Sequence, residues 1–168
     1  GFWTTIFIAF IAVGVVEETF KFGGLLGYPY HRPFFNEPMD GIMYSVMIGM
    51  GFATFENVLY ADRFGLETAL VRAFTAVPAH AVFAVILGYF VGLARFDREK
   101  RVPLLLKGYG ITVVVHGIYD FFILQSLFSW LIIFAMVVLV ISIYFARKMV
   151  LEHQLNSPFR EEEIETLE

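Results

Sequence analysis

Five apolar stretches of about 20 residues each run through this 168-residue chain and restrict what it can fold into. A helix of that length crosses the hydrocarbon core of a bilayer. Backbone N–H and C=O groups in lipid must pair internally, which leaves only helices and closed barrels. We therefore predict an all-α, polytopic transmembrane bundle with spans at residues 4–26, 41–61, 73–95, 104–125 and 127–147.

The composition supports the membrane assignment and excludes several kinds of site. Hydrophobic residues make up 58% of the chain, charged residues 17%, and the mean hydropathy is +0.71, outside the usual range of soluble domains. The net charge of -4 comes mainly from acidic residues at the C-terminal end, so no nucleic-acid surface is predicted. A chain without cysteine has no disulfide, no thiol nucleophile and no thiolate metal site.

The chain divides into a membrane core and a short polar end. We predict a transmembrane helical core at 1–150 and an acidic tail at 151–168. Three prolines indicate a loop within 23–40, and a second connector is expected at 62–72. Because the chain enters its first apolar stretch directly, we expect further spans upstream of it.

Basic residues set the predicted orientation. Alternating spans place ten of the twelve Lys and Arg residues on one side of the membrane, and only Arg63 and Arg72 on the other. Short loops rich in Lys and Arg stay in the cytoplasm. This bias predicts an outer start of the chain and a cytoplasmic acidic tail.

Two features of the second and third spans predict how they pack. Small residues let helix backbones approach closely. A proline inside a helix kinks it, and Pro78 is expected to do so just before His80. The small residues are Gly49, Gly51 and Ala53 on the second span and Ala84, Gly88 and Gly92 on the third.

Ionisable residues lie inside four of the spans. Each charge at the bilayer centre costs about 2.5–3.5 kcal/mol on insertion scales, so such residues usually serve a function. They are Glu17, Glu18 and Lys21 on the first span, Glu56 with the amide Asn57 on the second, His80 on the third, and His116 and Asp120 on the fourth.

Helical spacing groups these side chains. Residues four apart share a helix face, which pairs Glu17 with Lys21 and Asp120 with His116. We expect an ion pair from Lys21 to a glutamate, and an Asp120 carboxylate that orients the His116 ring. Supporting roles are predicted for Lys21, Asn57 and Asp120.

A buried layer of carboxylates and imidazoles can hydrolyse a bond in two ways. In one, Glu56, His80 and His116 bind Zn²⁺, and Glu17 or Glu18 deprotonates a water at the open position. In the other, a buried glutamate acts on water without metal and a histidine stabilises the oxyanion. The chain has no H-E-x-x-H motif, so both remain open.

Two other function classes use similar residues. Acidic and histidine side chains within spans also form proton relays in transporters. However, transporters often show internal repeats, and none is found in this sequence. A non-catalytic scaffold could use the same polar residues to hold helices together.

Five strings, in order, resemble the PrsW family of intramembrane proteases, which is similar to the CAAX-processing and Abi membrane proteases. The strings cover most of the chain between the first and fourth spans. They are V-E-E-T-F-K at 16–21, E-P-M-D-G-I-M-Y at 37–44, G-F-A-T-F-E-N at 51–57, V-R-A-F-T-A-V-P-A-H at 71–80 and H-G-I-Y-D-F at 116–121.

The resemblance implies a protease of the bacterial plasma membrane, classed with metalloproteases, that makes the first cut in a membrane-anchored anti-sigma factor. Its partners would be that substrate and the lipid bilayer. Glu17, Glu18 and His116 match positions regarded as catalytic in the family, and Glu56 and His80 complete the polar set. Family members usually carry further hydrophobic segments before the E-E span.

Overall fold

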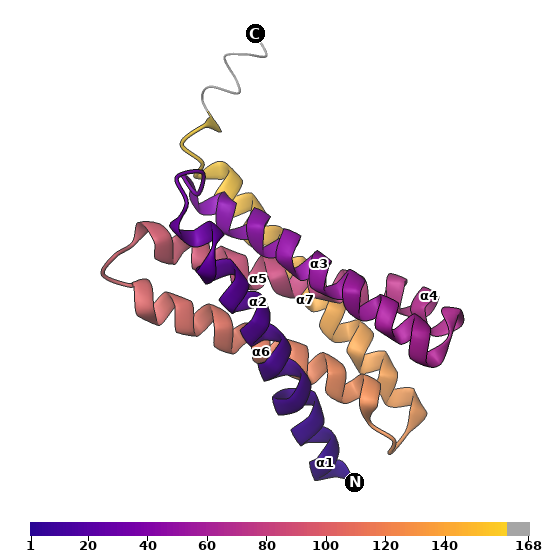
Figure 1. The fold of residues 1–168 in the computed structure, drawn as a ribbon. Helices are drawn as coiled ribbons and strands as arrows, with labels where there is room; N and C mark the ends of the chain where they lie inside the picture. Colours follow the sequence, from indigo (N-terminus) through magenta and orange to yellow (C-terminus); the bar gives the residue numbers. More distant parts are fainter. Residues whose placement is uncertain (161–168) are drawn as a thin grey trace.

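The computed structural model describes residues 1–160, and every regular element in that range is helical (Figure 1). The all-α transmembrane prediction is confirmed. The elements are α1 (Phe2–Ile6), the π-helix η1 (Phe7–Val15), α2 (Val16–Gly27), the 3-10 turn η2 (Pro29–His31), α3 (Pro38–Phe64), α4 (Leu66–Phe74), α5 (Ala76–Phe96), α6 (Arg101–Leu124), the 3-10 turn η3 (Ser129–Leu131) and α7 (Ile132–Leu155).

Four helical segments are long and apolar enough to cross a membrane: Pro38–Phe64, Leu66–Phe96, Arg101–Leu124 and Ser129–Leu155. They correspond to the second to fifth predicted spans. The first predicted span is also helical from Phe2 to Gly27, but the π-helix η1 divides it into three parts. Large apolar side chains cover the outside of the bundle, including Phe20 at 70% exposure, as expected of helices that face lipid.

The π-helix η1 lies directly before the two glutamates of the first span. It packs along α6, where Phe10 contacts Gly117 and the small Gly14 faces the backbone of Val113. π-helical turns frequently occur at functional sites. Because η1 lies between α1 and Glu17, its turns set the direction in which Glu17 points relative to α1.

Glycines bring α3 and α5 into close contact. A Cβ atom added to Gly88 would collide with the backbone of Gly41, and one added to Gly92 would collide with Pro38. At Gly49 a Cβ would lie 2.8 Å from the side chain of Ala84. These contacts confirm the prediction for Gly49, Ala84, Gly88 and Gly92, whereas Gly51 is exposed and takes no part in the contact.

The predicted connector at 62–72 is wrong, because this stretch is helical. The helix α3 continues to Phe64, and Gly65 alone makes the turn into α4. Gly65 has a φ of 89°, a conformation that only glycine adopts readily.

The predicted kink of the third span lies earlier than expected. The chain breaks at Thr75, between α4 and α5, and not at Pro78 itself. The proline ring clashes with the carbonyl group four residues earlier, that of Phe74, which ends α4 there.

The other predicted boundaries also shift. Helix α2 runs to Gly27, so the loop predicted at 23–40 is shorter, and α7 continues five residues past 150, to Leu155. His153 on that extension is buried and stacks on Tyr89. Residues 151–155 therefore belong to the packed helix α7, and the acidic residues of the predicted tail from 161 onward lie outside the described residues.

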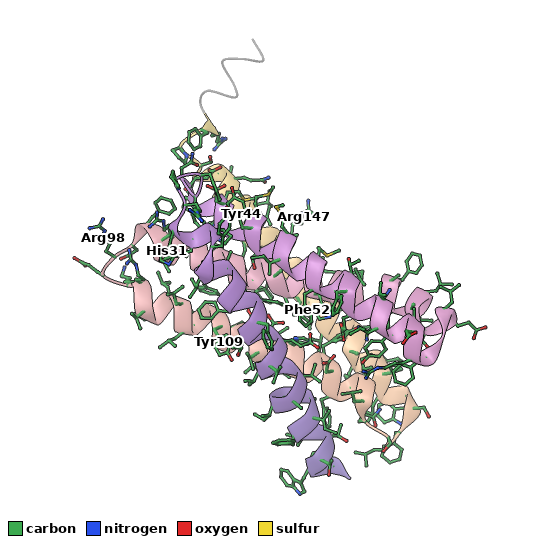
Figure 2. The ribbon with its side chains drawn as sticks, viewed as in Figure 1. His31, Tyr44, Phe52, Arg98, Tyr109 and Arg147 are labelled. Atoms are coloured by element: carbon green, nitrogen blue, oxygen red, sulfur yellow. The ribbon has the colours of Figure 1, made fainter. Side chains whose placement is uncertain are left out.

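The helix ends gather at two opposite ends of the bundle (Figure 1). One end holds the α2–α3 link, the α5–α6 link and the end of α7; Figure 2 shows His31 and Arg98 there. The other end holds the N-terminus, the α3–α4 turn and the α6–α7 link. The basic links lie at the first end, and Arg63 lies at the second.

We predict that Gly88→Ala lowers the thermal unfolding midpoint in detergent. Its methyl group would enter the α3–α5 contact, and overpacking costs about 1–3 kcal/mol. Gly110→Ala is the control, because no heavy atom lies within 4 Å of its added Cβ and alanine favours a helix. Equal midpoints for the two variants would contradict the close-contact assignment.

Candidate functional site

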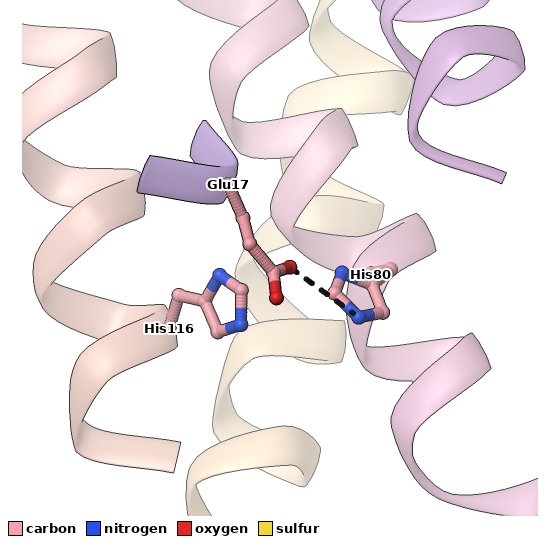
Figure 3. A group of neighbouring side chains, drawn as sticks. All are labelled: Glu17, His80 and His116. Carbon is pink, nitrogen blue, oxygen red and sulfur yellow. Dashed lines mark ion pairs between the residues drawn. The ribbon is translucent and has the colours of Figure 1, made fainter. Parts of the chain in front are cut away.

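The polar residues of four spans meet inside the bundle. Glu17, Glu18 and Lys21 come from α2, Glu56 from α3, His80 from α5 and His116 from α6. Each contacts at least one of the others through side-chain atoms. Residues up to 99 positions apart in the sequence thus form one cluster, from Glu17 to His116 (Figure 3).

The Lys21 ammonium group lies at the centre of the cluster and is 3% exposed. Its Nζ atom is 2.7 Å from Oε1 of Glu18 and 3.6 Å from Oε2 of Glu17. The predicted ion pair is therefore present. Lys21 also donates a hydrogen bond of 2.8 Å to Nδ1 of His80, a contact that sequence spacing could not predict.

The His116 ring is held by carboxylates from two helices. Its Nδ1 atom lies 2.8 Å from Oε1 of Glu18, and its Nε2 atom lies 3.3 Å from Oδ2 of Asp120. Asp120 therefore contacts His116 as predicted. Glu18 is fully buried and fixes the orientation of the ring.

The His80 ring is fixed from both sides. An ammonium group only donates hydrogen bonds, so Nδ1 of His80 accepts from Lys21 and Nε2 carries the proton. That Nε2 donates to Oε2 of Glu56 over 3.1 Å. Glu56 in turn forms an ion pair of 2.7 Å with Arg72 of α4.

Sequence reasoning assigned Arg72 only to the outer membrane surface. In the structure its guanidinium group also lies 3.6 Å from the centre of the Tyr60 ring, so it holds α4 against α3. The only feature of the sequence that pointed to a role for Arg72 in the site is its place in the family-like string at 71–80. Asn57 has a similar effect, since its amide donates to the carbonyl of Ala69 on α4, away from the histidines.

The Glu17 carboxylate lies between the His80 and His116 rings (Figure 3). Its Oε2 atom is 4.0 Å from Nε2 of His80. That oxygen is buried and has no hydrogen-bond partner among residues 1–160. Ligand atoms of Glu17, His80 and His116 lie within 4.8 Å of one another.

This donor set fits a zinc ion. Two histidines and a glutamate are an established catalytic zinc set, and the Glu18 contact at Nδ1 of His116 is typical of a ligand histidine. The set differs from the predicted one, because Glu17 takes the place of Glu56. For His80 to coordinate through Nε2, its proton would have to move to Nδ1, which would break the hydrogen bond from Lys21.

A cavity of about 340 Å³ adjoins the cluster and reaches toward the end of the bundle with the α3–α4 turn. Glu18 and Lys21 do not line it, which separates them from the residues that can contact a reactant. The ionisable residues that line it are Glu17, Glu56, Arg72, His80, His116 and Asp120. The arrangement can hold and activate a water molecule beside a bound reactant.

Comparison with known proteins gives one consistent family. A family model described as PrsW family intramembrane metalloprotease matches residues 1–146. The chain is similar to proteins named Protease PrsW from Geobacillus kaustophilus strain HTA426, at 40% identity over 118 residues (70% of this chain, 52% of that protein), and Bacillus subtilis strain 168, at 40% over 126 residues (74% and 57%). Protease PrsW of Halalkalibacterium halodurans is 37% identical over 150 residues (88% and 69%).

The matched proteins are longer than this chain, which spans about half the length of the first two relatives. No solved structure matches it.

We predict that Lys21→Met strongly destabilises the fold. It would leave the carboxylates of Glu17 and Glu18 buried without their cation, and breaking a buried ion pair costs about 3–5 kcal/mol. Lys100→Met is the control, because Lys100 pairs with Asp97 on the exposed surface, where such pairs contribute little. Thermal unfolding in detergent would compare the two, and a stable Lys21→Met variant would contradict the central role of the ammonium group.

Proposed function

The chain belongs to the PrsW family of intramembrane metalloproteases, and we propose that it carries the hydrolytic centre of an intramembrane endopeptidase. The observation that carries this proposal is the Glu17 carboxylate between His80 and His116, beside a cavity inside an apolar bundle. Family membership favours a protease over the transporter and scaffold alternatives.

Glu17 is the residue on which the proposed chemistry depends. In the route without metal, its carboxylate takes a proton from a water molecule in the cavity, and the water attacks the carbonyl carbon of a peptide bond. Glu17 then passes that proton to the amine nitrogen as the C–N bond breaks. His116 faces the same cavity, and its Nε2–H, which contacts Asp120 in this structure, would turn to the oxygen that becomes negative. Glu18 keeps the His116 ring in place through Nδ1.

In the route with metal, Glu17, His80 and His116 would hold a zinc ion. Zinc in a site of this kind polarises a carbonyl group and activates water. Glu56 and Asp120 also line the cavity, so either carboxylate can accept a proton there. Glu18 would then orient the His116 ligand through Nδ1, whereas Lys21 would give up its hydrogen bond to His80.

The proposed substrate is a membrane-anchored anti-sigma factor, as the sequence resemblance implies. The cavity lies toward the end of the bundle opposite the basic links, and the charge bias predicts that this end faces outside. A first cut near the outer surface of a bacterial plasma membrane is consistent with this position. The substrate helix must unwind locally, because helical peptide bonds are shielded by their own hydrogen bonds.

We predict that Glu17→Gln and His116→Ala lose cleavage of a reconstituted anti-sigma factor while both proteins still insert in membranes. A general base contributes about 10²–10⁴-fold to a rate. Glu67→Gln is the matched control, since Glu67 is exposed in the first turn of α4. Cleavage by Glu17→Gln at the parent rate would remove Glu17 from the site.

Metal analysis of detergent-purified protein separates the two routes. If zinc is part of the site, we expect about one ion per chain in the parent and its loss in Glu17→Gln and His80→Ala, since structural and catalytic zinc sites need their full ligand set. Glu56→Gln should retain the ion, because Arg72 and His80 already bind that carboxylate. A metal-free parent that cleaves its substrate would favour Glu17 as the base.

A further inference from the structure

A second cavity, of about 310 Å³, lies beside the first and has a mostly apolar wall. It is formed by the end of α4, the start of α5, the second half of α6 and the first two turns of α7. Its residues that the first cavity does not share are Val71, Thr75, Ile132, Ile133 and Met136.

The two cavities share a boundary. Arg72, Ala76, Tyr119, Asp120 and Ile123 line both of them. The second cavity is therefore adjacent to the histidine site, with only these side chains between the two. Asp120, which contacts His116, marks the point where the polar site meets the apolar wall.

Two hydrogen-bond donors at this boundary form no hydrogen bond of ordinary geometry in the described chain. Tyr119 is only 3% exposed, and its hydroxyl group has only the nearby side chain of Thr75, on the wall of the same cavity, to interact with. The Nε atom of Arg72 is also buried and without a partner, although its Nη2 atom is bound to Glu56. Buried donors normally find an acceptor, and the carbonyl oxygens of an unwound peptide are acceptors of the right kind.

We propose that the second cavity is a substrate subsite, which takes an apolar side chain within one or two residues of the bond that is cut, while Tyr119 donates a hydrogen bond to the substrate backbone. The inference rests on the proposed protease function and states which substrate side chain the protease prefers near the cut. An apolar side chain suits the wall of isoleucine, valine and methionine. The carboxylate of Asp120 at the entrance disfavours an acidic side chain.

The test uses the full chain in liposomes with a single-span anti-sigma factor whose cut has been mapped by mass spectrometry. Each residue within two positions of the cut is replaced in turn by Ala, Leu, Phe and Asp. For the parent we expect one position at which Leu or Phe is cut about tenfold faster than Ala, since one pocket contact is worth about 10–200-fold. Asp should be cut slowest at that position.

Met136→Ala enlarges the cavity and should shift the preference at that position toward Phe over Leu by about tenfold. Val140→Ala is the matched control on the same helix, because Val140 is 65% exposed and does not line the cavity. Tyr119→Phe removes only the hydroxyl group and should lower kcat/KM about tenfold for every substrate, the value of one hydrogen bond.

An independent binding measurement uses the absence of cysteine from the chain. In the Glu17→Gln background, Ile133→Cys should form a disulfide with a substrate cysteine at the selected position, whereas Val140→Cys should not. Unchanged selectivity in Met136→Ala, together with no cross-link from Ile133→Cys, would overturn the subsite while the parent still cleaves. A parent that cleaves no substrate would overturn the proposed function, and the subsite with it.

Discussion

The buried ammonium group of Lys21 is the interaction on which the rest of the site depends. It lies within hydrogen-bond distance of Glu18 and His80 and near Glu17, so one cation balances two carboxylates and sets the tautomer of an imidazole. Without it, α2 would bring uncompensated negative charge into an apolar bundle. The position of α2 against α5 and α6 follows from this charge balance, and the close packing of α3 on α5 provides the rigid wall opposite.

Polar partners within one helix could be predicted from the sequence, and polar partners on different helices could not. The spacing of four residues correctly paired Lys21 with a glutamate and His116 with Asp120. Partners on different helices depend on how far each helix is rotated, which hydropathy does not determine. Glu18 against His116 and Arg72 against Glu56 were therefore missed, and the predicted metal set names Glu56, whereas in the structure Glu17 lies closest in geometry to a shared site with the two histidines.

The short helix α4 shows how a wrong boundary hides part of a site. Residues 62–72 have the composition of a connector, but a single glycine turn lets the chain continue as helix, and Pro78 ends that helix at Phe74. This geometry folds α4 back against α3 and the start of α5. Arg72 can then contact Glu56 from α4, and the same residue helps to form the wall shared by both cavities.

The π-helix η1 can absorb a change in the number of residues that precede Glu17. A single residue inserted into an α-helix rotates everything beyond it by about 100°, which would turn Glu17 away from the histidines. A stretch that already has the extra residue per turn of a π-helix can take up a gained or lost residue by exchanging α and π turns. Differences in length within α1 can thus be absorbed before they reach Glu17, so that its carboxylate keeps its direction toward the histidines.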